Sequence, residues 1–212
     1  MARRDPVVAE DLSPSPGLIR FLYVTAAVNG AAILVVEILG ARMLVPAMGT
    51  SHFVWTAQIG VTLMALATGY YLGGRWVDAS PRLANLYYAT LAAAVYLCAT
   101  VPLVEPVSSA CLGKMNLAFG SLLASAFLFL VPLALLAMTL PFLTRMLTQS
   151  VDDVGGNVGR LSAISTVGSV VGTLLLGFYL LPALGSRVIL YGVSAALLRA
   201  VAHDTVSGLG SL

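Results

Sequence analysis

The sequence is 212 residues long, 59% of them hydrophobic and only 9% charged, with a formal net charge of +2. A soluble domain of this length exposes much of its surface to water, so this composition excludes a water-soluble globular fold. The small net charge comes from cations in the connecting loops, and we infer no nucleic-acid partner. The expected surroundings of the chain are a lipid bilayer.

The apolar residues form six long blocks, each apolar on all sides. About 20 such residues cross roughly 30 Å of hydrocarbon as a helix. The alternating segments of a membrane β-barrel are absent. The sequence predicts an all-α, polytopic bundle with six transmembrane helices over 18–44, 54–76, 83–103, 117–140, 159–181 and 188–202. This 18–202 domain is expected to follow a flexible cytoplasmic leader (1–17) and to precede a short cytoplasmic tail (203–212).

The first block contains the most informative residue, Glu37, because an ionisable group inside a membrane span usually marks a cavity, a pathway or a partner. Asn29 lies eight residues earlier on the same helix face. Gln58 on the second block is expected at a similar depth, and Arg42 or Arg187 are further potential partners. These residues predict either a polar clamp between the first two helices or a solute or proton site.

Small residues one turn apart predict close helix contacts in two blocks. Gly69 and Gly73 form such a pair in the second block, and Gly168 and Gly172 form one in the fifth. Ser165 and other small residues extend the fifth-block pair over nearly a full face. We therefore expect the fifth helix at the bundle centre or at a dimer seam.

The end of the second block carries Arg75 and Asp78, which are three residues apart. A helical turn that continues into the membrane interface brings such a pair together, either as a charge-paired helix end or as a gating latch. Farther along, Pro132 predicts a kink within the fourth helix, and Pro141 is expected to end it. A polar, flexible connection is then predicted over 141–158.

The distribution of cations predicts the orientation. An inner N-terminus places eight of the eleven Lys and Arg residues on the cytoplasmic side and three on the outer side. The outer three are Arg42, Lys114 and Arg187. Both termini are therefore expected in the cytoplasm, with the helices in a bacterial inner membrane.

Metal and cofactor chemistry has little support in the sequence. His52 and His203 lie on opposite sides of the predicted membrane, so they cannot build a site together, and we predict no cofactor. Cys98 and Cys111 read as small hydrophobic residues, with an outer disulfide as the alternative. Phosphate-binding loops, G-x-S-x-G and H-E-x-x-H motifs are absent.

Four runs of residues resemble a known family. They are VEILGARMLVPAMGTS (36–51), GYYLGGR (69–75), GRLSAISTVGSVVGT (159–173) and LLPALGSR (180–187). Together they are similar to the membrane domain of bacterial spermidine synthase-like integral membrane proteins, a major-facilitator-like module. The resemblance matches Glu37, Arg42, Trp55, Gly73, Gly74 and Arg75 to recurrent family positions.

In that family a soluble aminopropyltransferase domain normally follows the helices, whereas only thirteen residues follow Arg199 here. We therefore expect no enzymatic activity. The first expectation is a non-catalytic membrane module that assembles with itself or with a larger membrane complex. The alternatives are a half-facilitator that transports a polyamine or another small solute as a dimer, and a membrane subunit for a separately encoded enzyme.

Overall fold

The computed structural model describes residues 16–80, 82–148 and 154–209, and within these ranges every regular element is helical. The elements are α1 (Pro16–Met48), α2 (His52–Ala79), α3 (Leu83–Lys114), α4 (Leu117–Ser125), η1 (Ala126–Leu130), α5 (Val131–Ala137), α6 (Thr139–Leu147), α7 (Val154–Leu175), η3 (Leu176–Leu180), α8 (Leu181–Ala183) and α9 (Ser186–Leu209). The short segments η1 and η3 are π-helical. The all-α prediction is confirmed for the described residues.

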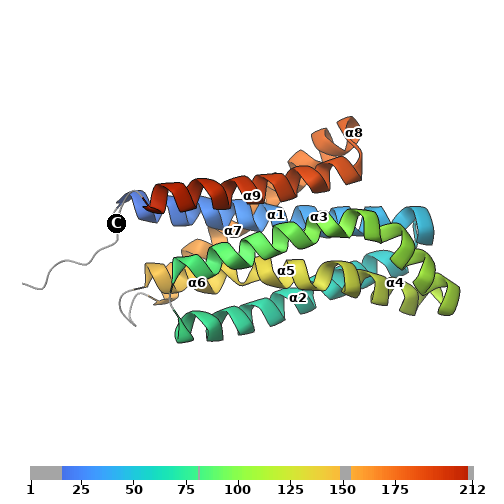
Figure 1. Cartoon of the computed structure of the whole chain (residues 1–212), viewed down its shortest axis with the longest axis horizontal. Coiled ribbons are helices and arrows are strands. Elements are labelled where there is room, and N and C mark those ends of the chain that lie inside the picture. The colour runs from blue at the N-terminus through green and yellow to red at the C-terminus, as the bar shows by residue number, and fades with distance from the viewer. Residues whose placement is uncertain (1–15, 81, 149–153, 210–212) are drawn as a thin grey trace, which may run out of the picture.

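The elements build six rods that run along one axis (Figure 1). One rod is continuous from α4 through η1 and α5 to α6, and another runs from α7 through η3 to α8. The first turn of α1 and the last turn of α9 lie at the same end of the bundle (Figure 1). We call this the proximal end, and the opposite end the distal end.

Five helical segments are long and apolar enough to cross a membrane. They are Ile19–Met48, His52–Ala79, Ala84–Lys114, Leu117–Leu147 and Val154–Ala183. Large apolar side chains such as Leu63 and Phe178 are exposed on the outside of the bundle, as expected for surfaces that face lipid. The sixth rod, α9, contains Arg187 and Arg199 and is not among the five, so a sixth crossing stays a prediction.

The helices are longer, and the connections shorter, than the sequence pattern predicts. α3 continues past Leu103 to Lys114 although it contains Pro102 and Pro106. The fourth rod continues past Pro141 to Leu147, so the prediction that Pro141 ends it is wrong. A proline removes one backbone donor, and neighbouring helices in a bundle supply replacement partners, so the rod bends without ending.

Two connections at the distal end are tight because their residues cap the adjoining helices. Between α1 and α2, Gly49 has a positive φ of 75° and its N–H donates to Val45 O at 2.7 Å. The Ser51 hydroxyl then accepts from the Phe53 N–H at 3.2 Å and begins α2. Between α3 and α4, the Asn116 side chain accepts from the Phe119 N–H at 3.0 Å.

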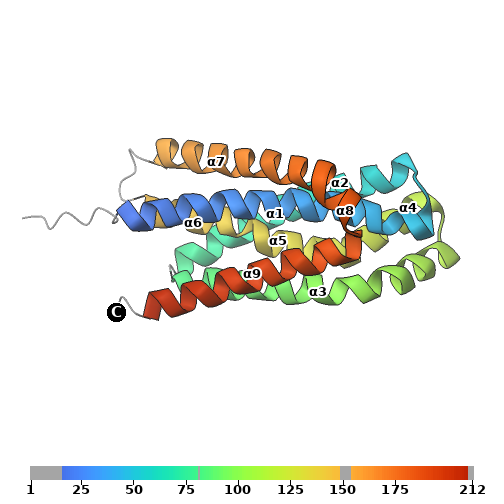
Figure 2. The ribbon, with the colours of Figure 1, turned by 90° about the horizontal axis from the view of Figure 1, so that it is seen from above.

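The rods pack in a defined order. α1 packs most extensively against α7, α9 against α3, and both α2 and α3 against the rod of α4, α5 and α6. Figure 2 shows α7 on the outside of the bundle, next to α1. Leu161 is the one buried residue among those of α7. The prediction that this helix occupies the bundle centre is therefore wrong, because its small-residue face contacts a single helix and its bulky residues point outward.

Candidate functional site

Asn29 is buried in the membrane region and is bonded to the junction of α5 and α6. Its Nδ2 donates to Leu136 O at 3.1 Å, and its Oδ1 accepts from Thr139 Oγ1 at 3.4 Å. The α-helix is interrupted at Met138, between these two partners. Asn29 thus joins α1 to the break in the fourth rod. Among the described residues it has no hydrogen bond to Gln58.

A second break in the fourth rod lies at Pro132, where the sequence predicts a kink and the structure has the π-helix η1. Pro132 has no N–H, so one carbonyl before it is left without a helical partner. That carbonyl is the one of Leu128, four residues earlier, in an α-helix, or the one of Phe127, five residues earlier, in a π-helix. Helix α3 supplies donors to both, from Tyr96 OH to Phe127 O at 2.7 Å and from Thr100 Oγ1, which is shared between Leu128 O at 3.2 Å and Tyr96 O of its own helix at 2.9 Å. The sequence interpretation missed both donors. Pro132 signals a carbonyl that needs a partner but does not indicate which helix supplies it.

Gln58 is completely buried, and its amide lies against Gly40 of α1. A Cβ added at Gly40 would lie 2.7 Å from Gln58 Nε2, so α1 and α2 meet closely here. Among the described residues, neither Oε1 nor Nε2 of Gln58 has a hydrogen-bond partner. A buried polar group without a partner costs about 1–3 kcal/mol. Gln58 therefore closes the α1–α2 contact without forming the predicted clamp to Glu37.

Glu37 is half-buried and, within the ranges that the structure describes, has neither an ion pair nor a hydrogen bond. Helical geometry defines its position on α1. Gly30, two turns below, touches Ser165 of α7, and Gly40, three residues above, touches Gln58 of α2. The Glu37 carboxylate therefore lies on the strip of α1 between the contacts with α7 and α2, at the side of the bundle.

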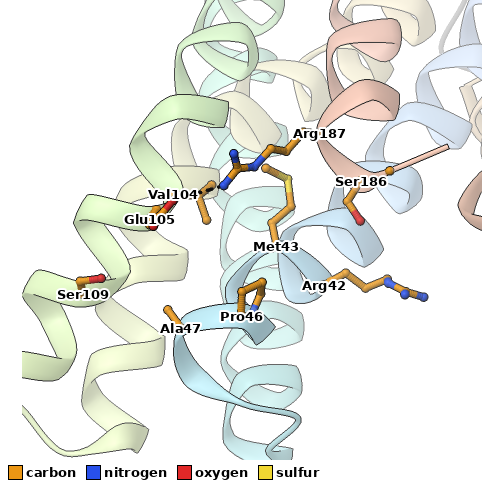
Figure 3. Close-up of a pocket in the computed structure, with 10 residues that line it drawn as sticks. Arg42, Met43, Pro46, Ala47, Val104, Glu105, Ser109, Ser186 and Arg187 are labelled. Carbon is orange, nitrogen blue, oxygen red and sulfur yellow. Dashed lines mark hydrogen bonds and ion pairs between the residues drawn. The ribbon is translucent and has the colours of Figure 1, made fainter.

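Arg42 and Arg187, the other predicted partners of Glu37, line a different site. They belong to a cleft of about 480 Å³ at the distal end, formed by α1, α3 and the start of α9 (Figure 3). Here Arg187 Nη2 pairs with Glu105 Oε2 at 3.3 Å, and both side chains are mostly exposed. Among the described residues, Asn29, Glu37, Gln58 and Arg42 share no hydrogen bond or ion pair, so a single polar site formed by the four stays a prediction.

The predicted latch between Arg75 and Asp78 is not formed. α2 does continue through both residues to Ala79, but Arg75 Nη1 donates to Tyr71 OH at 3.1 Å, and the guanidinium lies 5.8 Å from the Tyr71 ring centroid. Tyr71 lies four residues before Arg75, on the same helix face, and competes with Asp78 for the guanidinium. Asp78 instead lines a proximal cleft between α2, α6 and α7 that also contains Arg145.

The predicted packing glycines lie at two close helix contacts. Gly69 and Gly73 of α2 lie against the α5–α6 junction: a Cβ at Gly69 would be 2.6 Å from Ala137 Cβ, and one at Gly73 would be 2.8 Å from Met138 Cα. In α7, Gly168 touches the backbone of Ala27. A Cβ at Gly172 would lie 2.7 Å from Ala31 Cβ.

No metal-binding group of three or more His, Cys, Asp or Glu residues is found in the described parts of the chain. Cys98 and Cys111 are free thiols. They lie thirteen residues apart on the single helix α3, which separates them by about 20 Å, so they cannot form a disulfide with each other. His203 is described only as part of α9.

Comparison with known proteins gives no match: no family model, no curated protein and no solved structure matches this chain. The resemblance to the membrane domain of spermidine synthase-like proteins therefore stays a prediction from the residue runs themselves.

Proposed function

We propose that this protein is a non-catalytic, multi-pass membrane module whose role is to assemble in the bilayer with a second copy of itself or within a larger membrane complex. The observation that carries the proposal is Glu37. A carboxylate in the middle of a span is costly in hydrocarbon unless a polar group or water meets it. The described part of the chain provides no such partner, which favours a partner from outside the bundle.

The small-residue face of α7 packs on α1 within the chain, so a second bundle is left the neighbouring surface around Glu37. Ser162, Ser165, Ser169 and Thr173 recur along α7 with the small residues Gly168 and Gly172 among them. The hydroxyl of Ser169 donates to Ser165 O at 3.1 Å, whereas Thr173 Oγ1 has no partner among the described residues. Small and hydroxyl-bearing residues are typical of helix contacts in membranes, because they allow close approach and hydrogen bonds. We infer that the surface around Glu37, between α2 and α7, is where a second bundle packs.

The orientation belongs to the same proposal. We infer six crossings, with α9 as the sixth, both termini in the cytoplasm and the protein in a bacterial inner membrane. The excess of Lys and Arg on one side of the predicted membrane supports this orientation. The described ends of the chain also lie together at the proximal end of the bundle, as an even number of crossings requires (Figure 1).

Sedimentation of the purified protein in density-matched detergent tests the assembly. We expect a dimer that Glu37→Leu weakens roughly tenfold, since an interhelical hydrogen bond in a membrane contributes about 1–2 kcal/mol. Glu37→Gln keeps the ability to hydrogen-bond and should remain dimeric. Glu105→Leu, which removes a carboxylate from the distal cleft, is the matched control. A parent protein that sediments as a monomer, or a Glu37→Leu variant as dimeric as the parent, contradicts the proposal.

A second candidate function rests on the charge of the same carboxylate. An unpaired Glu37 also suits a cation ligand in a dimeric half-facilitator, with a polyamine as the proposed solute. Glu37→Gln separates the two functions, since it keeps a hydrogen-bonding amide but removes the charge. Polyamine uptake by proteoliposomes that is lost in Glu37→Gln, while the dimer persists, favours transport over assembly alone.

A further inference from the structure

We propose that the distal cleft between Arg42 and Arg187 is an anion site that binds a phosphate group, with the headgroup of an anionic phospholipid as the favoured source. The cleft holds about 480 Å³ and receives side chains from α1, α3 and α9 (Figure 3). Its charged residues are two arginines and one carboxylate, that of Glu105, so it carries a net positive charge.

The arginines provide the charge for phosphate; in Figure 3 their side chains point in different directions, so the exposed Arg42 side chain turns toward the cleft when an anion binds. A planar guanidinium offers paired N–H donors that match two oxygens of a phosphate. Arg42 is exposed and has no ion pair among the described residues, so its donors are available. Arg187 points toward Glu105 in Figure 3, but 66% and 76% of these two side chains are exposed. Exposed ion pairs contribute little to stability, so Arg187 can exchange Glu105 for an incoming anion.

The backbone at the mouth of the cleft adds donors. Gly185 and Ser186 line it, and the 24-residue helix α9 begins at Ser186. The first backbone hydrogen bond of this helix runs from Ile189 N to Gly185 O, at 3.1 Å. The N–H groups of the preceding residues have no partner within the helix and attract anions.

The rest of the cleft wall is apolar, which indicates a ligand with both a charged and an apolar part. Met43, Pro46 and Val104 line the cleft beside the arginines, and Met43 and Val104 are themselves buried. Arg42 lies six residues, or about 9 Å, before the end of α1, a depth at which lipid headgroups lie above the hydrocarbon. A phospholipid can place its phosphate on the arginines and its glycerol and upper acyl carbons on this apolar wall. A soluble phosphate would contact the arginines but not the apolar wall.

Titration calorimetry on the full-length protein in neutral detergent tests the site with three probes: short-chain phosphatidylglycerol, short-chain phosphatidylcholine and inorganic phosphate. We expect phosphatidylglycerol to bind more tightly than phosphatidylcholine. Arg42→Gln and Arg187→Gln should each weaken its binding about tenfold, since each removes a charged hydrogen bond. Lys114→Gln removes a cation from the same end of the bundle, outside the cleft, and should leave binding unchanged.

Glu105→Gln gives a result in the opposite direction. It removes the carboxylate that competes for Arg187, so phosphatidylglycerol should bind several-fold more tightly, and a variant that had merely unfolded would not gain affinity. Inorganic phosphate binding that follows the same pattern of variants, without lipid preference, assigns the site to a soluble phosphate. Equal binding by the arginine variants and Lys114→Gln, or weaker binding by Glu105→Gln, overturns the proposal.

Discussion

At the scale of single residues, the polar side chains inside the bundle act mainly as partners for backbone carbonyls. Thr100 and Tyr96 donate to the two carbonyls before Pro132, and Asn29 donates to Leu136 O beside the break at Met138. Lipid offers no hydrogen bonds, so the carbonyls freed at a break in a membrane helix need other donors, and neighbouring helices are one source. These residues therefore maintain the irregular shape of the fourth rod, whereas Glu37 has no such role.

Thr100 allows this role to be measured. Thr100→Val removes the donor to Leu128 O while keeping the shape of the side chain, so we expect a loss of about 1–2 kcal/mol in the free energy of unfolding. The Thr100 hydroxyl also donates to Tyr96 O of its own helix, at 2.9 Å. Thr90→Val is the matched control for that bond, because the Thr90 hydroxyl donates to Leu86 O of its own helix. Unfolding in mixed detergent micelles, followed by circular dichroism, gives both values.

A double-mutant cycle identifies the mechanism. Pro132→Ala restores a backbone N–H at the position whose missing donor Thr100 replaces. Thr100→Val should therefore cost less in the Pro132→Ala background than in the parent. An equal cost in both backgrounds would show that the Thr100 hydroxyl does not compensate for the proline.

At the scale of whole helices, the close contact between α1 and α7 is the clearest consequence of small residues. Gly30, Gly168 and Gly172 bring the two backbones together, and a side chain at any of them would collide with the facing helix. This small-residue face is therefore used within the chain. Assembly with a second bundle is left to the surface around Glu37.

Gly168→Leu should separate α7 from α1 and lower the free energy of unfolding by about 1–3 kcal/mol, as overpacking a tight contact does. Gly177→Leu provides the control, since an added Cβ there meets no atom within 4 Å apart from its chain neighbours and the backbone of its own helix. Thermal unfolding of both variants in detergent compares them. If the two variants unfold at the same temperature, this contact does not hold α7 on α1.

The sequence predicts the type of each element better than its ends or its neighbours. Long apolar blocks require helices of membrane-spanning length, and the structure has five of them. Proline is an unreliable stop signal in this setting, so α3 and α6 extend beyond their predicted ends. The glycine pairs indicate close packing, but the same spacing suits any facing helix, so the choice of α1 as the neighbour of α7 depends on the assembled bundle.

The candidate site was harder to predict for the same reason. Asn29 and Glu37 share a face of α1 by sequence spacing, yet Asn29 is bonded to the break at Met138, whereas Glu37 has no hydrogen-bond partner among the described residues. Spacing also permits an Arg75–Asp78 pair, but an aromatic hydroxyl four residues earlier takes the guanidinium. Helical periodicity identifies which residues share a face, and only packing identifies what that face meets.

At the scale of the whole molecule, the number of membrane crossings depends on whether α9 spans the bilayer. The two described chain ends lie together, so the bundle contains an even number of passes if α9 crosses the membrane with the rest (Figure 1). α9 packs mainly on α3, and Leu190 and Leu197 are buried. A helix packed in this way along a membrane-spanning neighbour is expected to follow it across the bilayer, despite Arg187 near its start and Arg199 within it.

Reporter fusions in a bacterial host test this topology. A fluorescent protein that matures only in the cytoplasm should be bright after Leu212, whereas a phosphatase active only outside the cytoplasm should be active in the connection at Met115 and Asn116. Ending the chain at Gly185, before α9 begins, should move a C-terminal reporter to the outer side. A full-length C-terminus that reports an outer location would mean that α9 lies along the membrane and that the bundle crosses it five times.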